Sequence, residues 1–201
     1  MKTRMAFTTS LMTSILIGAW TPAVEVQGEV VWFYDGPFDL PIPADPDAGK
    51  GWMEDAIIKV PQHLTLEDLD VSVSLTHTNV FDLQLYVESP GGTRVLLNMY
   101  DPFTEYFEGK DYQGTTFDDE ADTRIEQASA PFAGRFVPRG SLAAFDGEDA
   151  YGSWRLCIYD AYYSDTGHLD TFGLAISVPE PATVAFVLLG VGFTGFCRRF
   201  R

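Results

Sequence analysis

Hydrophobic and polar side chains alternate in two stretches near the C-terminal end of the chain, residues 154–158 and 172–176. Large apolar side chains take every second position in both stretches: Trp154, Leu156, Ile158, Phe172, Leu174 and Ile176. Period-two alternation buries one face of a strand and exposes the other. Turn sequences rich in glycine and aspartate lie at residues 146–149 and 165–167. We therefore expect a hairpin-like pair of strands, joined by a long acidic loop, that closes a β-structure.

Similar patterns predict further strands earlier in the chain. They cover residues 29–34, 53–60, 69–77, 82–88, 94–99 and 135–137. Residues 35–51 contain four prolines and three glycines and predict a loop or an extended arm, while residues 100–122 predict a long acidic loop. Because the strands follow one another closely and no helical period appears between the two ends, the pattern predicts an all-β fold, an antiparallel β-sandwich.

The first 23 residues have the order of charge and hydrophobicity that is typical of a secretory signal peptide. Lys2 and Arg4 precede an apolar run at residues 11–20, and small residues follow it up to Ala23. Such a run forms a signal helix that is removed on export. We expect cleavage after Ala23, with Gly28 as the alternative site.

A proline-rich motif and an apolar tail follow the last predicted strand. The motif is Val178, Pro179, Glu180 and Pro181, and its prolines cannot continue a strand ladder. Residues 182–197 carry no charge and predict a single transmembrane helix of about 24 Å, which snorkelling arginines would fit to a core of roughly 30 Å. The arginine cluster predicts a cytoplasmic C-terminus. The predicted anchor includes Ala182, Leu188, Phe196, Arg198, Arg199 and Arg201.

The distribution of charge limits the partners of the chain. Its formal net charge is −16, but five of the 13 basic residues lie in the terminal tails, so the remaining eight basic and 29 acidic residues leave the body at −21. Such a surface repels nucleic acid and anionic lipid, and we expect no nucleic-acid partner. The two cysteines, Cys157 and Cys197, lie in segments of different kind, which predicts neither a disulfide nor a zinc site.

Several stretches resemble the P domain, also called the P/Homo B domain, of subtilisin-like proprotein convertases. VSLTHTNVFDLQLYVESPGGTRVLL at residues 73–97 is similar to its opening half, and GEDAYGSWRLCIYD with DTGHLDTFGLAIS is similar to its closing half. The resemblance runs over residues 55–177 and implies a jelly-roll β-sandwich of the galactose-binding-like type. It departs at Val80 and Phe81, which precede Asp82 where the convertases have Arg-Gly.

The C-terminal tail resembles a PEP-CTERM sorting signal, because the Pro-Glu-Pro motif, the short apolar helix and the arginines occur in that order. The resemblance implies an exosortase-type membrane enzyme as a partner. It also implies export in a Gram-negative bacterium, with transient anchoring in the inner membrane and then display at the cell surface or release.

These features divide the chain into four segments. They are a signal peptide at residues 1–23, an N-terminal strand and Pro/Gly-rich arm at residues 24–54, the P-domain-like sandwich at residues 55–177, and the sorting and anchor segment at residues 178–201.

A catalytic Ser/His/Asp set is the first chemistry to consider, given the proteases that carry P domains. His77, Asp82 and Ser89 lie in one hairpin region, but a nucleophile also needs an oxyanion hole and a cleft. Ser89 precedes a proline, and no G-x-S-x-G elbow occurs in the chain. Only about 30 residues separate the signal from the P-domain-like region, which is too few for a protease domain. We therefore expect no enzyme activity and no catalytic residue.

Acidic loops make calcium a candidate cofactor with a loop-stabilising role. Calcium takes several oxygen ligands from turn-rich loops. The candidate ligands are Asp146, Glu148 and Asp149, with Asp118 or Asp82 contributed by another loop. The alternative is that these carboxylates only cap turns and face solvent.

Aromatic side chains gather in two predicted loops and make a sugar ligand a further candidate. The first loop holds Tyr100, Phe103, Tyr106, Phe107 and Tyr112, and the second holds Tyr159, Tyr162 and Tyr163. Loop aromatics either stack on ligands or pack beneath their own loop.

Three functions remain open at this point. The first is an exported P-domain protein, anchored at the cell surface or released, that acts as a non-catalytic interaction or stabilising module with a protein partner. The second is an accessory P domain for a separately encoded subtilisin-like serine endopeptidase. The third is a carbohydrate-binding surface module with a glycan partner.

Overall fold

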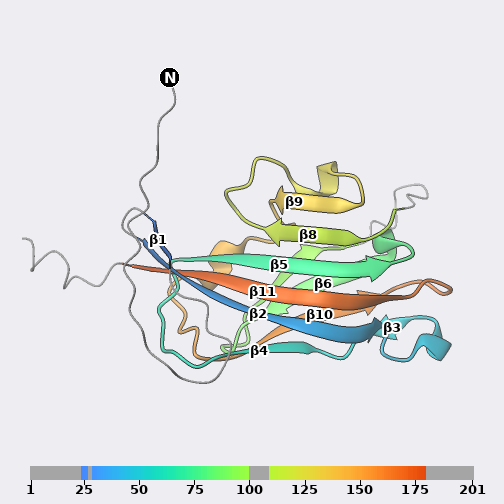
Figure 1. The fold of residues 1–201 in the computed structure, drawn as a ribbon, viewed down its shortest axis with the longest axis horizontal. Coiled ribbons are helices and arrows are strands. Elements are labelled where there is room, and N and C mark those ends of the chain that lie inside the picture. The colour runs from blue at the N-terminus through green and yellow to red at the C-terminus, as the bar shows by residue number, and fades with distance from the viewer. Residues whose placement is uncertain (1–23, 27–28, 100–108, 180–201) are drawn as a thin grey trace, which may run out of the picture.

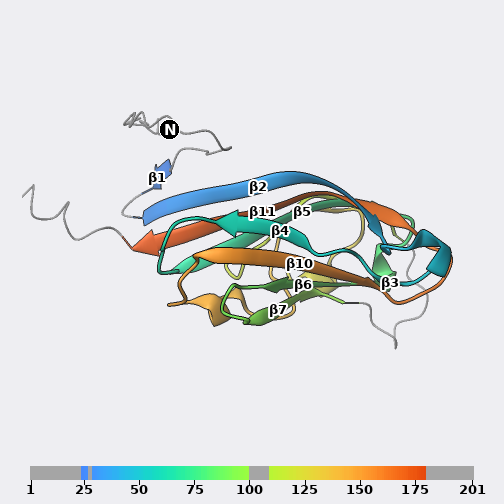
Figure 2. The same cartoon turned by 90° about the horizontal axis from the view of Figure 1, so that it is seen from below.

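The computed structural model describes residues 24–26, 29–99 and 109–179 (Figure 1). These residues form two β-sheets that pack face to face, and the two layers are seen edge-on in Figure 2. The remaining regular elements are four short 3-10 turns: η1 (Pro46–Ala48), η2 (Val80–Asp82), η3 (Ile125–Gln127) and η4 (Leu142–Phe145). The prediction of an all-β sandwich is therefore confirmed.

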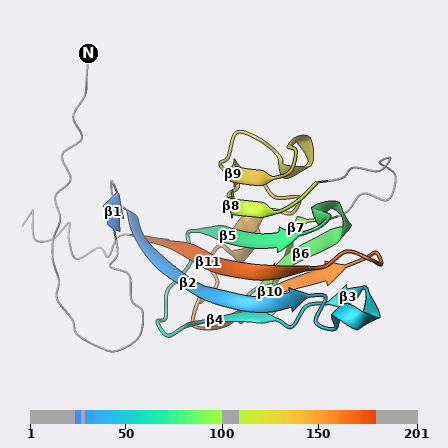
Figure 3. The same cartoon turned by 45° about the vertical axis from the view of Figure 1, so that its right-hand side comes forward.

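The larger sheet has six strands in the order β1-β2-β11-β5-β8-β9, which Figure 3 shows side by side. All neighbours in it are antiparallel except β8 and β9, which pair in parallel. Its strands are β1 (Val24–Val26), β2 (Glu29–Ile42), β5 (Asp68–His77), β8 (Tyr112–Phe117), β9 (Phe132–Phe136) and β11 (Gly167–Pro179).

The smaller sheet has five strands in the order β3-β10-β6-β7, with β4 also pairing β10. Its strands are β3 (Gly51–Trp52), β4 (Ala56–Val60), β6 (Leu83–Glu88), β7 (Arg94–Asn98) and β10 (Gly152–Asp160). The turn between β6 and β7 closes with a hydrogen bond from Gly92 N to Ser89 O. The predicted strands at residues 82–88 and 94–99 and the hairpin between them are therefore confirmed.

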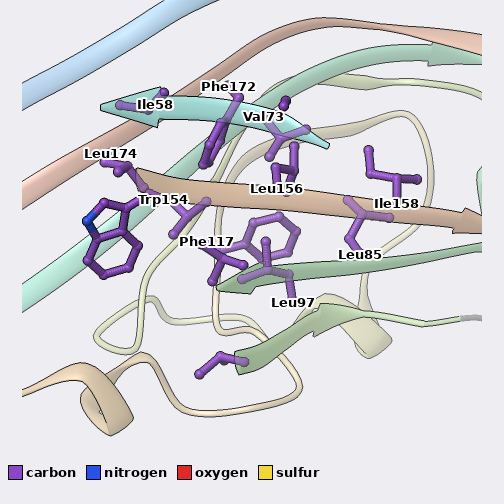
Figure 4. Close-up of a cluster of buried hydrophobic side chains, with 14 of the residues drawn as sticks. Ile58, Val73, Leu85, Leu97, Phe117, Trp154, Leu156, Ile158, Phe172 and Leu174 are labelled. Atoms are coloured by element: carbon purple, nitrogen blue, oxygen red, sulfur yellow. The ribbon is translucent and has the colours of Figure 1, made fainter. Parts of the chain in front are cut away.

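The core lies between the two sheets and is built from the apolar phase of each strand. Trp154, Leu156 and Ile158 of β10 point into it and are completely buried, and Figure 4 shows them among side chains from both layers. β5 and β11 contribute the facing layer with alternating burial. Because each strand gives one face to this core, the opposite faces of both sheets are left to solvent or to partners.

The two C-terminal strands do not pair with each other, so the predicted hairpin-like arrangement is wrong. β10 lies in the five-stranded sheet and β11 in the six-stranded one, in different layers of Figure 2. Both strands bury one face, as the alternation indicates, but those faces meet across the core. Alternation reports which face is buried and leaves the hydrogen-bonding neighbour undetermined.

β2 runs through residues for which the prolines predict a loop or an extended arm; residues 35–42 are extended, but they form part of a sheet strand. The strand continues to Ile42 with Pro37 and Pro41 in register with β11. Past Val31, β2 has no strand neighbour on its other edge among the described residues. A proline is tolerated on such an edge because no ladder partner needs its missing N–H.

β8 lies inside the stretch that was expected to be a long acidic loop, residues 100–122. Tyr112, Thr115 and Phe117 face the core from it, while Gly114 takes a positive φ of 63° and coincides with a register shift against β5. This irregularity breaks the period-two pattern that marks the other strands. Residues 109–111 and 118–122 of the stretch are non-strand, as predicted.

The predicted signal helix at residues 1–23 and the predicted transmembrane helix at residues 182–197 lie outside the described residues. Among the residues that the structure describes, no helix is sufficiently long and apolar to cross a membrane. The finer assignment to a jelly-roll topology stays a prediction.

We expect truncation of a core side chain to cost far more than truncation of an outward one on the neighbouring strand. Leu156→Ala removes a fully buried side chain of β10, for which we expect a loss of about 2–5 kcal/mol in the free energy of unfolding. Ile57→Ala, on the exposed face of β4 at 45% exposure, serves as the control and should lose less than about 1 kcal/mol. Equal losses in urea denaturation would contradict this placement of the core.

Candidate functional site

The three residues considered for catalysis do not come together. Asp82 ends η2 just before β6 and Ser89 follows β6, so a six-residue strand of about 20 Å separates them. The Ser89 hydroxyl is buried and accepts a hydrogen bond from Thr93 N at 3.2 Å. Its role is to close the β6–β7 turn.

His77 belongs to a buried polar cluster at the end of β5. Its Nε2 lies 3.3 Å from Asp160 Oδ2, and both side chains are fully buried. The backbone N–H of Asn79 donates to His77 Nδ1 at 3.2 Å, and the Asn79 carbonyl oxygen lies 2.9 Å from the same nitrogen. The pair of His77 and Asp160 joins the six-stranded sheet to the end of β10 in the other layer.

Asp82 extends the same cluster toward the β10–β11 loop. Asn79 Nδ2 donates to Asp82 Oδ1 at 3.1 Å, and Thr78 Oγ1 donates to Asp165 Oδ1 at 2.7 Å. Burial, followed by the hydrogen bond and charge of the Asp165 carboxyl group, raises the pKa of Asp82 to about 6. The Asp82 carboxyl group is therefore protonated in mildly acidic solution, and the cluster connects two loops at this end of the sandwich.

A second polar cluster surrounds Arg135 on the outer side of β5, β8 and β9. Its guanidinium lies 2.6 Å from Asp118 Oδ2 and 3.0 Å from Asp70 Oδ2. Burial raises the pKa of Asp70 to about 6. Burial also acts upward on Asp118, but hydrogen bonds from the Glu120 backbone and from Arg135 lower its pKa overall. Arg135 of β9 thus pairs with one carboxylate on β5 and one in the loop that follows β8.

The structure distributes the predicted calcium ligands over separate places. Asp82 and Asp118 lie in the two clusters just described, while Glu148 accepts a hydrogen bond from Thr93 Oγ1 and Asp149 lies 2.7 Å from His63 Nδ1. Asp146 is exposed in the turn that precedes Gly147. In the described part of the chain, no group of three or more His, Cys, Asp or Glu side chains is arranged to hold a metal ion. Calcium binding by these residues stays a prediction.

The aromatic residues expected in loops differ in position and in burial. Tyr112 is buried, and its hydroxyl accepts from Asn98 Nδ2 at 2.8 Å. Tyr162 and Tyr163 are exposed at the tip of the β10–β11 loop, where Lys50 Nζ lies 4.4 Å from the Tyr163 ring centroid. Tyr159 lies on a strand, on the outward face of β10. Four of the expected residues lie outside the described residues: Tyr100, Phe103, Tyr106 and Phe107.

The outer face of the five-stranded sheet carries the main cluster of accessible aromatic side chains, which we term the aromatic face: Trp52, Tyr86, Arg94 and Tyr159. The Trp52 ring lies 5.0 Å from the Tyr159 ring and 6.4 Å from the Tyr86 ring, at tilts of 51° and 41°. The Arg94 guanidinium lies 4.2 Å from the Tyr86 ring centroid and 5.4 Å from that of Trp52. Four strands from distant parts of the sequence build this cluster.

Strand register explains why these side chains meet. Trp52 is the cross-strand partner of Tyr159, and Tyr86 is the partner of Cys157 on the same face of β10. Arg94 pairs with Glu88, two positions from Tyr86 on β6. Sequence reasoning had noted Tyr159 but missed the other three residues. The available signal was the position of Tyr86 and Tyr159 in the outward phase of their strands, where polar residues are expected.

Both basic and acidic side chains border the aromatic face. Of the eight basic residues of the body, Lys59, Arg94 and Arg155 point outward from this sheet. Arg155 Nη1 forms an ion pair with Glu88 at 3.3 Å. Exposed apolar surface of this kind, edged by polar groups, is typical of a binding site.

Two family models match adjoining parts of the chain. A family model of the proprotein convertase P-domain matches residues 66–176, and a model of the PEP-CTERM protein-sorting motif matches residues 177–201. No curated protein matches the chain.

Two solved structures are similar to the chain over most of its length. One is the Aeromonas sobria serine protease (ASP) in complex with the chaperone (ORF2), at 20% identity and a TM-score of 0.46, covering 78% of this chain and 28% of that one. The other is the serine protease of Aeromonas sobria, at 19% identity and a TM-score of 0.44, covering 76% and 28%. The chain thus spans less than a third of the length of each protease chain.

The raised pKa of Asp82 predicts how stability changes with pH. A carboxyl group whose pKa is higher when folded stabilises the protein below about pH 4 and loses that contribution as the pH rises through about 6. Asp82→Asn removes this titration and supplies an N–H donor to Asp165. We therefore expect the melting temperature of the variant, relative to the unmodified protein, to be higher at pH 8 than at pH 4.

Asp122→Asn, at an exposed aspartate, is the control for this measurement. Its melting temperature should follow that of the unmodified protein at both pH values. A pH-independent difference for Asp82→Asn would show that the pKa of Asp82 is not raised in the folded protein.

Proposed function

The chain belongs to the proprotein convertase P-domain family, and from this premise we propose that it is an exported, non-catalytic interaction module that binds its partner through the aromatic face. P domains accompany catalytic units rather than perform their chemistry. The proposed partner acts in trans.

The aromatic face is the observation that carries this proposal. Trp52 keeps 49% of its surface exposed on the outer side of a sheet, beside two tyrosines and a stacked arginine. Tryptophan, tyrosine and arginine are the residues that dominate binding energy at interfaces. A solvent-exposed sheet face without a partner is normally polar, so this composition points to recognition.

The sorting motif supports export as the setting of that interaction. The PEP-CTERM match begins at Ser177, within β11, so the sandwich passes directly into the sorting segment. Ser177, Val178 and Pro179 still pair with β2, while Glu180 and Pro181 lie outside the described residues. We propose processing by an exosortase-type enzyme, a transient anchor in the inner membrane of a Gram-negative cell, and final display at its surface or release.

A carbohydrate partner is the second candidate, favoured by the exposed ring of Trp52. The first candidate is the non-catalytic interaction module. The family name suggests that its partner is a separately encoded serine protease, beside which the chain would have an accessory role. Both leave this chain without catalytic chemistry of its own.

Site-specific photocrosslinking in the producing cells tests the binding surface. In one variant, a benzophenone amino acid replaces Leu96 of β7, which pairs with Tyr86 of β6. In the control variant, it replaces Asp170, an exposed residue of β11 in the other sheet. We expect a higher-mass adduct from position 96 and none from position 170. Absence of an adduct at 96, or equal adducts at both positions, would contradict binding at the aromatic face.

A serine-reactive fluorophosphonate probe tests the non-catalytic assignment on the same exported protein. We expect no labelling. Labelling that disappears when a single serine is changed to alanine would overturn the assignment.

A further inference from the structure

We infer that the aromatic face binds a neutral polysaccharide, with the Trp52 ring stacking on a sugar ring and Arg94 binding hydroxyl groups beside it. This inference rests on the proposed function and names the chemistry of the ligand. It is carried by the unused hydrogen-bond donors of the face, by its size and by the charge that surrounds it.

Arg94 differs from the other arginines of the body in having no acceptor for its N–H groups among the described residues. Arg124, Arg135 and Arg155 form ion pairs with carboxylates, and Arg139 donates to Asn98 Oδ1 at 3.2 Å. The Arg94 guanidinium carbon instead lies over the rings of Tyr86 and Trp52. A guanidinium held there by a cation–π contact keeps its N–H groups unpaired, and it presents several donors in a fixed plane. Neighbouring hydroxyl groups of a sugar suit such a fork.

Further polar groups stand next to the same rings. The Tyr86 hydroxyl donates to Gln84 Oε1 at 3.1 Å, which leaves the Gln84 amide nitrogen available, and Gln84 is the cross-strand partner of Tyr159. A sugar ring offers an apolar face and a rim of hydroxyl groups. An exposed ring with amide and guanidinium donors around it matches both parts of that surface.

The size of the exposed aromatic surface favours a sugar over a folded protein. A stable protein interface buries about 800 Å² on each partner. On the aromatic face only Trp52 is exposed to half of its surface, whereas Tyr86 and Tyr159 are partly covered. An extended peptide cannot add to the sheet beside Arg94 either, because the carbonyls of Leu96 and Leu97 on β7 already accept from Gly140 N and Arg139 N.

The charge of the body selects a neutral ligand over an acidic one. A body at −21 repels polyanions at long range. The few basic groups of the aromatic face are partly neutralised, since Glu88 pairs with Arg155. An uncharged polymer is not repelled in this way, and its hydroxyl groups can still accept hydrogen bonds from Arg94 and Gln84.

Affinity electrophoresis of the exported, processed protein tests this inference. The gels contain a soluble neutral polysaccharide (xyloglucan, galactomannan or mixed-linkage glucan) or, for comparison, polygalacturonate. We expect retardation by at least one neutral polymer and none by polygalacturonate. Trp52→Ala and Arg94→Gln should each lower the affinity for that polymer, measured from the retardation, at least tenfold.

Matched controls separate the aromatic face from other exposed groups. Tyr163→Ala removes an exposed ring elsewhere, and Arg124→Gln removes an exposed guanidinium elsewhere; both should bind as the unmodified protein does. Melting temperatures show whether each variant is folded. If a destabilised Trp52→Ala variant prevents the comparison, Arg94→Lys, which keeps the charge but not the fork, should still weaken binding.

Three results would overturn the inference. They are no retardation by any of the three neutral polymers, preferential retardation by polygalacturonate, and unchanged binding by folded Trp52→Ala and Arg94→Gln variants. A protein adduct at position 96 together with no polysaccharide binding would leave the proposed function standing and refute only the neutral sugar. Failure of both experiments would refute both.

Discussion

The pairing of β11 with β2 on one side and β5 on the other is the constraint on which the six-stranded sheet depends. β11 is in register with β2 from Gly167 to Pro179 and with β5 from Gly167 to Ser177, interrupted by one irregularity near Thr171. Both partners precede it by many residues, so the centre of this sheet is missing until the last strand is in place. The apolar side chains of β11 join the core that also contains the inner face of β10. The five-stranded sheet is then held in place, and so is the aromatic face on its outer side.

The last strand also connects the fold to the sorting of the protein. The PEP-CTERM match starts at Ser177, which is still part of the β11 ladder, so no spacer separates the sandwich from the sorting segment. In the proposed arrangement the folded domain is completed next to the segment that directs it to the envelope. The aromatic face lies on the opposite layer from β11.

Local patterns predicted the strands with regular alternation, and they failed where the fold depends on distant neighbours. β5, β6 and β7 were predicted nearly to the residue because each buries one face. β8 was missed because Gly114 interrupts its period, and the proline part of β2 was missed because its free edge is a property of the sheet. For the site, outward Tyr86 and Tyr159 were visible in the sequence, but only register brings Trp52 and Arg94 to them. The acidic residues, in contrast, were grouped by sequence and are separated by the fold.

Hydrogen exchange of the exported protein tests most directly that β11 closes the sandwich. Amides held in the central ladder open only with the whole domain, so we predict that those of β11 between Phe172 and Ile176 exchange as slowly as those of β10 and β6. Fast exchange in β11 while β10 and β6 remain protected would contradict the account, because the five-stranded sheet and its outer face would then be stable without the last strand.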